Sequence, residues 1–183
     1  MKTSPSIDLI LNLTRPGRSV AMLGVGHGFF PCALGRSGAA PFHSEGDGTT
    51  PYGIWPLRCI FYRADRLPRP RSGLPVFPIR PDDGWCDAAR DACYNQPVKL
   101  PFRASAEHLW REDHLYDLIL VPGINDNPVI TGRGSALFVH TARPGLLPTE
   151  GCIGLKRRDL VRLLPRLSPR SRLIISPGHE RRK

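Results

Sequence analysis

Short apolar runs, separated by glycine and proline, dominate the hydrophobic pattern of the chain. Residues 7–13 alternate imperfectly between apolar and polar side chains, and residues 19–23 form a short apolar run. Both segments predict strands, with the turn-like Arg15-Pro16-Gly17 between them. Residues 54–62 predict a longer strand, which follows the turn signal Asp47-Gly48. The first third of the chain therefore favours β-structure.

The second half of the chain continues this pattern. Its clearest strands are predicted at residues 115–121 and 134–140, where β-branched and aromatic side chains are bounded by glycine or proline. Residues 171–176 predict a final strand. Residues 68–81 are rich in proline and arginine, which favours a loop.

Two segments predict short helices. Ser105 precedes the sequence AEHLWRED as an N-cap would, so residues 106–113 are expected to be helical. Residues 157–164 predict a second helix that ends at Pro165, because proline has no backbone N–H to continue it. Together these elements predict a mainly β fold with short helices.

The composition agrees with many short strands joined by turns. The 183 residues include 18 glycines and 20 prolines, and 40% of them are hydrophobic. This length predicts one domain over residues 1–176, followed by a basic, disordered tail at residues 177–183. No apolar run approaches the roughly 18 residues of a membrane span, so no transmembrane segment is expected. The start of the chain lacks an uninterrupted apolar segment and a small-residue cleavage site, so no signal peptide is visible.

The charge is concentrated at the C-terminal end. The formal net charge is +10, and residues 156–183 carry +8 of it. Such a segment attracts any polyanion, which leaves a nucleic-acid-binding protein as one alternative. No aromatic residue occurs from Lys156 onward, so the stacking side chains of a single-strand binder are missing there. We therefore expect no nucleic-acid partner.

The cysteines do not predict a disulfide framework or a metal site. There are five, and an odd number leaves at least one thiol free. Cys86 and Cys93 are close enough in sequence to pair in an oxidising compartment. No CxxC or HxxxH pair occurs, so a zinc site would need ligands from scattered positions. The glycine-rich residues 24–57 hold neither dinucleotide nor P-loop motif, and we expect no metal and no cofactor.

One histidine and one cysteine stand out in residues 134–155, GSALFVHTARPGLLPTEGCIGL. His140 ends a predicted strand, and Cys152 follows a Pro/Gly loop and the glycine at 151. A neighbouring imidazole can lower the pKa of a thiol and pass its proton to a leaving amine. A preceding glycine allows close approach of a substrate carbonyl. The alternative is a small buried thiol and a structural histidine.

At these residues the chain resembles the L,D-transpeptidase catalytic domain, also called the YkuD or ErfK-type domain. The resemblance rests on His140, the run Thr149-Glu150-Gly151-Cys152-Ile153, and the upstream segment EGDGTTPYGIWPL at residues 45–57. GWCD at residues 84–87, YN at 94–95 and LYD at 115–117 resemble a short bacterial subgroup. The resemblance covers residues 34–175 and implies a mixed-sheet β-sandwich with a cleft.

The resemblance implies roles for four residues. Cys152 would be the nucleophile and His140 its general base and acid, oriented by the backbone carbonyl of Thr141. The N–H groups of Gly151 and Cys152 would form the oxyanion site. The implied reaction transfers an acyl group from a peptidoglycan stem peptide, through a Cys152 thioester, to an acceptor amine. The partners are stem peptides and the expected location is the periplasm or cell envelope.

The chain departs from the common family pattern at two positions beside the cysteine. Glu150 stands where the family has histidine, and Gly154 stands where arginine is frequent. If Cys152 lies on a strand, Gly154 shares its face, and we then expect Gly154 to leave space where a guanidinium often lies. Arg36 or Arg111 would then take over the contact with a substrate carboxylate. A thiol amidase or carboxypeptidase and a non-catalytic wall-binding module remain the alternative functions.

Overall fold

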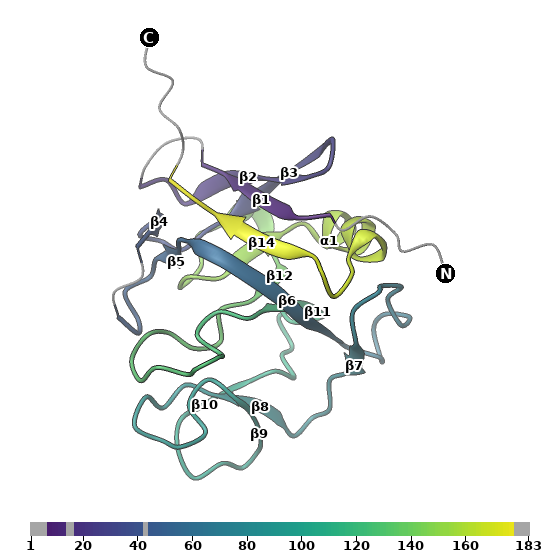
Figure 1. Ribbon diagram of the computed structural model, residues 1–183. Coiled ribbons are helices and arrows are strands. Elements are labelled where there is room, and N and C mark those ends of the chain that lie inside the picture. The colour runs from purple at the N-terminus through teal and green to yellow at the C-terminus, as the bar shows by residue number, and fades with distance from the viewer. Residues whose placement is uncertain (1–6, 14–16, 42–43, 178–183) are drawn as a thin grey trace.

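The computed structural model describes residues 7–13, 17–41 and 44–177. Nine strands form one mixed sheet in the order β11-β12-β13-β3-β2-β1-β14-β6-β7, and β6 also pairs with β11. The sheet therefore closes on itself and has a barrel-like shape (Figure 1). Its strands are β1 (Leu9–Asn12), β2 (Val20–Val25), β3 (Gly28–Ala33), β6 (Gly53–Tyr62), β7 (Val76–Pro78), β11 (Leu118–Pro122), β12 (Val139–Thr141), β13 (Ile153–Leu155) and β14 (Arg172–Ile175).

Alternating side chains of this sheet form the main core. In β1, Leu9 and Leu11 are buried and Ile10 is exposed, as the period of two in a strand requires. The helix α1 (Arg157–Leu163) adds Leu160 and Leu163 to the same core. It is followed by the 3-10 turn η2 (Leu164–Arg166), and η1 (Pro144–Leu146) lies between β12 and β13.

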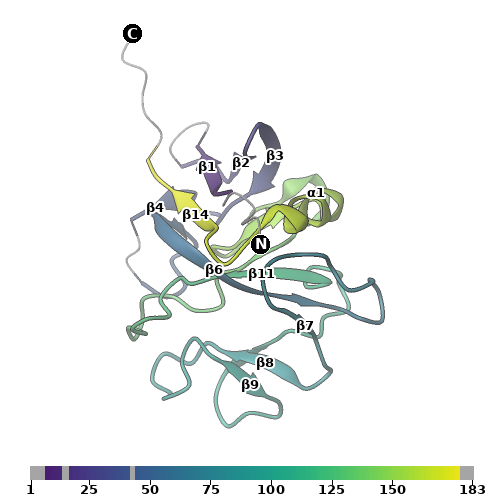
Figure 2. The same cartoon turned by 45° about the vertical axis from the view of Figure 1, so that its right-hand side comes forward.

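A second, three-stranded sheet lies apart from the closed sheet (Figure 2). It has the order β10-β8-β9 and consists of β8 (Asp83–Cys86), β9 (Pro97–Lys99) and β10 (Ala106–His108). Trp85 of this sheet packs edge-to-face on Phe138, with 5.0 Å between ring centroids. The short strands β4 (Ala39–Ala40) and β5 (Thr50–Pro51) pair with each other. The small sheet thus packs beside the segment that leads to His140.

The architecture confirms the predicted mainly β fold with a mixed sheet and short helices, and the closed sheet is compatible with a sandwich. The strands predicted at residues 54–62 and 171–176 and the helix at 157–164 are present within a residue or two. The predicted single domain over residues 1–176 stays a prediction. Residues 15–16 of the predicted turn and 178–183 of the predicted tail lie outside the described residues.

Three local predictions are wrong. Residues 106–113 form no helix, because Ala106 and Glu107 pair with Cys86 and Trp85 of β8, and this pairing satisfies the backbone groups that a helix would use. Residues 134–138 are not a strand, since Ala136 has a φ of 50°. Residues 68–81 include β7, which pairs in parallel with β6.

Among the described residues, every helix is too short or too polar to span a bilayer.

Candidate active site

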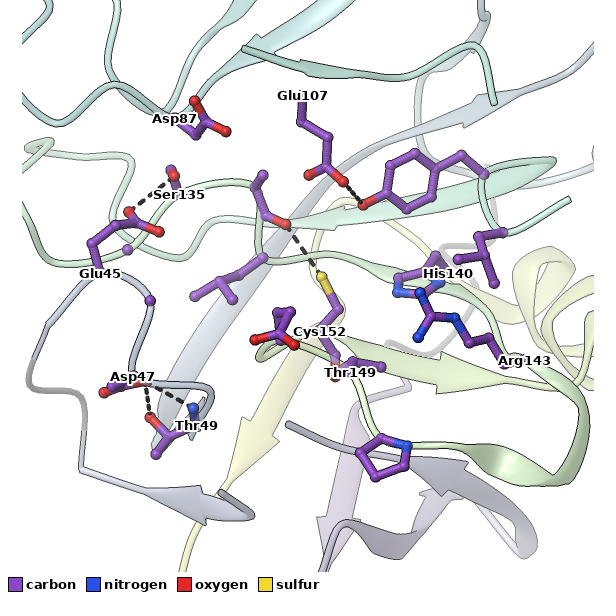
Figure 3. Close-up of a pocket in the computed structure, with 18 of the residues that line it drawn as sticks. Glu45, Asp47, Thr49, Asp87, Glu107, Ser135, His140, Arg143, Thr149 and Cys152 are labelled. Atoms are coloured by element: carbon purple, nitrogen blue, oxygen red, sulfur yellow. Dashed lines mark hydrogen bonds between the residues drawn. The ribbon is translucent and has the colours of Figure 1, made fainter. Parts of the chain in front are cut away.

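One cavity of about 310 Å³ opens between the small sheet and the ends of β12 and β13, and both His140 and Cys152 line it (Figure 3). The strands explain why they meet. β12 and β13 run parallel, with His140 opposite Gly154. Cys152 lies two residues before Gly154, so it comes to the same side of the sheet as His140.

The Cys152 thiol is held by two backbone groups. Its S–H donates to the carbonyl of Ala136 at 3.2 Å, and the N–H of Phe138 donates to Sγ at 3.3 Å. Burial raises the pKa of Cys152 to about 12. The thiol is therefore protonated at neutral pH, and the pKa depression expected from a nearby imidazole is not present.

The small sheet anchors the segment that contains Ala136, whose carbonyl accepts the hydrogen bond from the Cys152 thiol. Asn95 Oδ1 accepts hydrogen bonds from the Ala136 N–H at 3.2 Å and from the Trp85 indole N–H at 2.9 Å. Ser135 donates to Glu45 Oε2 at 2.9 Å. The GWCD and YN motifs thus support the backbone that contacts Cys152.

His140 is buried, with 5% of its surface exposed, and its ring is fixed from two sides. Nδ1 lies 2.9 Å from the Thr141 carbonyl oxygen. A carbonyl only accepts, so Nδ1 carries the proton and the other ring nitrogen, Nε2, is unprotonated in the neutral ring. Tyr116 packs edge-to-face on the ring at 5.2 Å between centroids. Burial lowers the pKa of His140 to about 4.

Gly151 has a backbone conformation that requires glycine. Its φ is 134°, and a Cβ there would lie 2.8 Å from both Leu137 Cδ2 and the Thr49 carbonyl oxygen. The Gly151 N–H donates to Thr149 Oγ1 at 3.2 Å, and the Gly151 carbonyl accepts from Thr50 Oγ1 at 3.0 Å. The N–H expected in the oxyanion site is therefore already engaged.

The two predicted arginines occupy different places. Arg36 does not line the cavity and forms an ion pair with Glu150 at its rim. Arg111 lines the cavity, but it binds both carboxylate oxygens of Asp113, at 3.0 and 2.5 Å.

The expectation of open space at Gly154 is wrong. A Cβ there would lie 3.2 Å from the Cα and Cβ of Ala142 and 3.4 Å from the Cβ of Ala33. The position is closely packed, so the open space expected beside the cysteine is not present.

Sequence reasoning missed four lining residues: Asp87, Glu107, Tyr116 and Arg143. Arg143 lies three positions after His140, and its charge contributes to the lowered pKa of that histidine. The sequence signal that could have pointed to Arg143 is its position in the loop between His140 and Cys152. The motifs GWCD and LYD contain Asp87 and Tyr116, whereas Glu107 was hidden by the helix prediction.

Within residues 7–13, 17–41 and 44–177, no group of three or more His, Cys, Asp or Glu side chains could hold a metal ion.

Comparison with known proteins gives one family. The profile of YkuD, the L,D-transpeptidase catalytic domain, matches residues 14–175. No curated protein and no solved structure has a significant match to the chain.

Proposed function

Because the chain belongs to the L,D-transpeptidase catalytic domain (YkuD) family, we propose that it is a cysteine acyltransferase acting on peptidoglycan stem peptides. The observation that carries the proposal is that the Cys152 thiol and the His140 ring line one cavity, with Nδ1 of the ring held by the Thr141 carbonyl. This arrangement supports a nucleophile and a base of fixed tautomer.

The first step cleaves an amide bond. Both groups start neutral, since burial raises the pKa of Cys152 and lowers that of His140. As Sγ attacks the carbonyl carbon after the third stem residue, Nε2 of His140 takes the thiol proton. The C–N bond then breaks, His140 returns the proton to the leaving nitrogen, and D-alanine departs. A thioester on Cys152 remains. The Phe138 N–H stabilises the developing negative charge on sulfur.

The second step resolves the thioester. An acceptor amine gives its proton to His140 and attacks the thioester carbon, and the Cys152 thiolate leaves and is protonated again. The product is an L,D cross-link. Attack by water on the same thioester gives carboxypeptidase or amidase activity instead. Backbone N–H groups at Gly151 and Cys152 remain in the proposal as oxyanion donors, which for Gly151 requires release from Thr149.

Arginine residues would bind a substrate carboxylate. Arg111 and Arg143 line the cavity and support this role, whereas Arg36 is held by Glu150 at the rim. Arg143 is thus added to Arg36 and Arg111, the two arginines that the sequence suggested for this contact. A periplasmic or envelope location, a domain filling residues 1–176 and the absence of a nucleic-acid partner belong to the same proposal.

A non-catalytic wall-binding module is the second candidate, and the raised pKa of the Cys152 thiol favours it. The test is mass spectrometry of the protein and its Cys152→Ala variant after incubation with disaccharide-tetrapeptides. Dimers that lack one D-alanine, formed only by the unsubstituted protein, support transpeptidation. Tripeptide alone indicates a hydrolase. Unchanged tetrapeptide with a folded sample indicates a binding module.

A further inference from the structure

The exposed side of α1 and of the turn after it carries basic side chains that few acidic residues neutralise. α1 and η2 bury Leu160, Leu163 and Leu164 in the main core, so their opposite side faces solvent. The only acid in residues 156–170 is Asp159, which is buried and whose Oδ1 lies 3.5 Å from Nε of Arg158. The exposed basic residues of this stretch are Lys156, Arg157, Arg158, Arg162, Arg166 and Arg170.

A second segment brings two more arginines to this side. The Gly73 N–H donates to the Leu167 carbonyl at 3.0 Å, so the loop at residues 68–73 lies against the end of η2. Arg69 and Arg71 are exposed in this loop, which leads from β6 to β7 and lies next to α1 (Figure 1). Six of the exposed basic residues form no ion pair within the described part of the chain, and we call these six the basic face: Arg69, Arg71, Lys156, Arg162, Arg166 and Arg170.

The side chains between these charges fit a lipid surface better than a nucleic acid. Val161 is 47% exposed, and Pro165 and Pro169 are exposed as well, so small apolar groups lie among the arginines. Residues 66–73 and 156–177 contain no Phe, Trp or Tyr, so no ring is available on which a base could stack. An anionic bilayer presents many phosphates in one plane, which attracts basic clusters, and small apolar side chains enter its headgroup region.

We propose that the basic face binds the surface of a bilayer that contains anionic phospholipid. Each lysine or arginine near such a surface strengthens binding about fivefold, so six unpaired charges are sufficient for stable attachment. None of the six residues lines the cavity that holds His140 and Cys152. Lys156 follows β13, whereas Cys152 precedes it, so the two lie beyond opposite ends of that strand. The membrane contact is therefore separate from the proposed acyl transfer and does not depend on it.

The test is co-sedimentation with two kinds of vesicle, one of phosphatidylcholine alone and one of equal parts phosphatidylcholine and phosphatidylglycerol. At a salt concentration of about 150 mM, the unsubstituted protein should bind only the vesicles with phosphatidylglycerol. Arg71→Gln, Arg162→Gln and Arg170→Gln combined should weaken this binding at least about tenfold. These three side chains are exposed, so the variant should keep the thermal unfolding midpoint of the unsubstituted protein.

The matched control removes the same number of charges from another part of the molecule. It combines Arg80→Gln, Arg90→Gln and Arg103→Gln, three exposed arginines in or beside the small sheet. Figure 1 and Figure 2 both show the small sheet and α1 on opposite sides of β6 and β11. Binding of this variant to the anionic vesicles should fall less than about threefold, because its basic face is intact.

Three outcomes overturn the inference. Equal binding to both kinds of vesicle would show that anionic lipid is not recognised. Equal losses in the two triple variants would mean that net charge acts without a particular face. Tighter binding to a double-stranded oligonucleotide than to the anionic vesicles, at the same salt, would assign the face to nucleic acid. Turnover of a tetrapeptide should be the same in both triple variants, so a failure of acyl transfer leaves the vesicle result unaffected.

Discussion

His140 donates its Nδ1 proton to the carbonyl of Thr141, the next residue in the chain, over 2.9 Å. The contact uses a backbone group that β12 fixes, so the tautomer of the ring follows from the main chain and not from a second acidic side chain. The base of the proposed reaction is thus set by local strand geometry.

This arrangement predicts the pH dependence of turnover. Only neutral imidazole accepts the thiol proton, and the pKa of His140 is lowered to about 4. We expect kcat/KM for a tetrapeptide to rise as pH increases through about 4 and to be level from there to pH 8. The measurement is a rate profile from pH 3 to 9. An inflection near 6.5, the ordinary value for histidine, would contradict a buried neutral base.

The thiol should be slow to alkylate at neutral pH. With a pKa near 12, Cys152 has a far smaller thiolate fraction than free cysteine, whose pKa is about 8.5. Iodoacetamide should modify Cys152 on the order of a thousandfold more slowly than free cysteine at pH 7. Peptide mass spectrometry separates this site from the other cysteines. Rapid labelling at pH 7 would indicate a preformed thiolate–imidazolium pair.

Gly151→Ala should unfold more easily and lose activity. The alanine would have a strained φ of 134° and a Cβ 2.8 Å from Leu137 Cδ2. We expect a loss of about 1–3 kcal/mol in the free energy of unfolding, measured by urea denaturation. Gly46→Ala is the control, because Gly46 also has a positive φ but has no atom within 4 Å of a Cβ. Equal losses in both variants would mean that the contact at Gly151 adds nothing to the strain.

Local sequence patterns were sufficient to predict those elements whose conformation depends least on distant backbone partners. The helix at residues 157–164 combines helix-forming residues with a stop at Pro165, and β6 and β14 are long or strongly apolar enough to be recognised. His140 and Cys152 stood out because a strand end and glycine neighbours are visible in the sequence. These signals depend only on nearby residues.

Features that depend on distant pairing could not be predicted in this way. Residues 106–108 have a helix start signal, but β8 is available to pair with them, and the pairing decides their conformation. The closure of β6 on β11 is equally non-local. Asp87 and Glu107 come together through such pairing of β8 with β10, so the sequence could not predict that they lie close to each other.

Arg63 should be important for stability although it lies outside the cavity. It is 2% exposed, its guanidinium binds Asp65 through two nitrogens at 2.8 Å, and it donates to the Arg111 carbonyl at 2.6 Å. It also lies 3.5 Å from the Trp110 ring centre. Arg63→Ala should cost about 2–3 kcal/mol, by chemical denaturation, because it removes a buried side chain and its hydrogen bonds, while Asp65 itself remains exposed to water. Arg58→Ala, which removes a more exposed ion pair with Asp126, should cost no more than about 1 kcal/mol. Similar costs for the two variants would contradict the role of burial.

Arg143→Ala should weaken substrate binding more than removal of either arginine suggested by the sequence. Arg143 lines the cavity near His140, while Arg111 is held by Asp113 and Arg36 by Glu150. We expect KM for a tetrapeptide to rise about tenfold in Arg143→Ala, with a smaller change in kcat, because a charge contact with the substrate carboxylate is lost. Arg36→Ala serves as the control and should leave both constants unchanged. Since the charge of Arg143 also contributes to the low pKa of His140, the acidic limb of the rate profile should move to higher pH in this variant. A rise in KM confined to Arg111→Ala would assign the carboxylate contact to Arg111 instead.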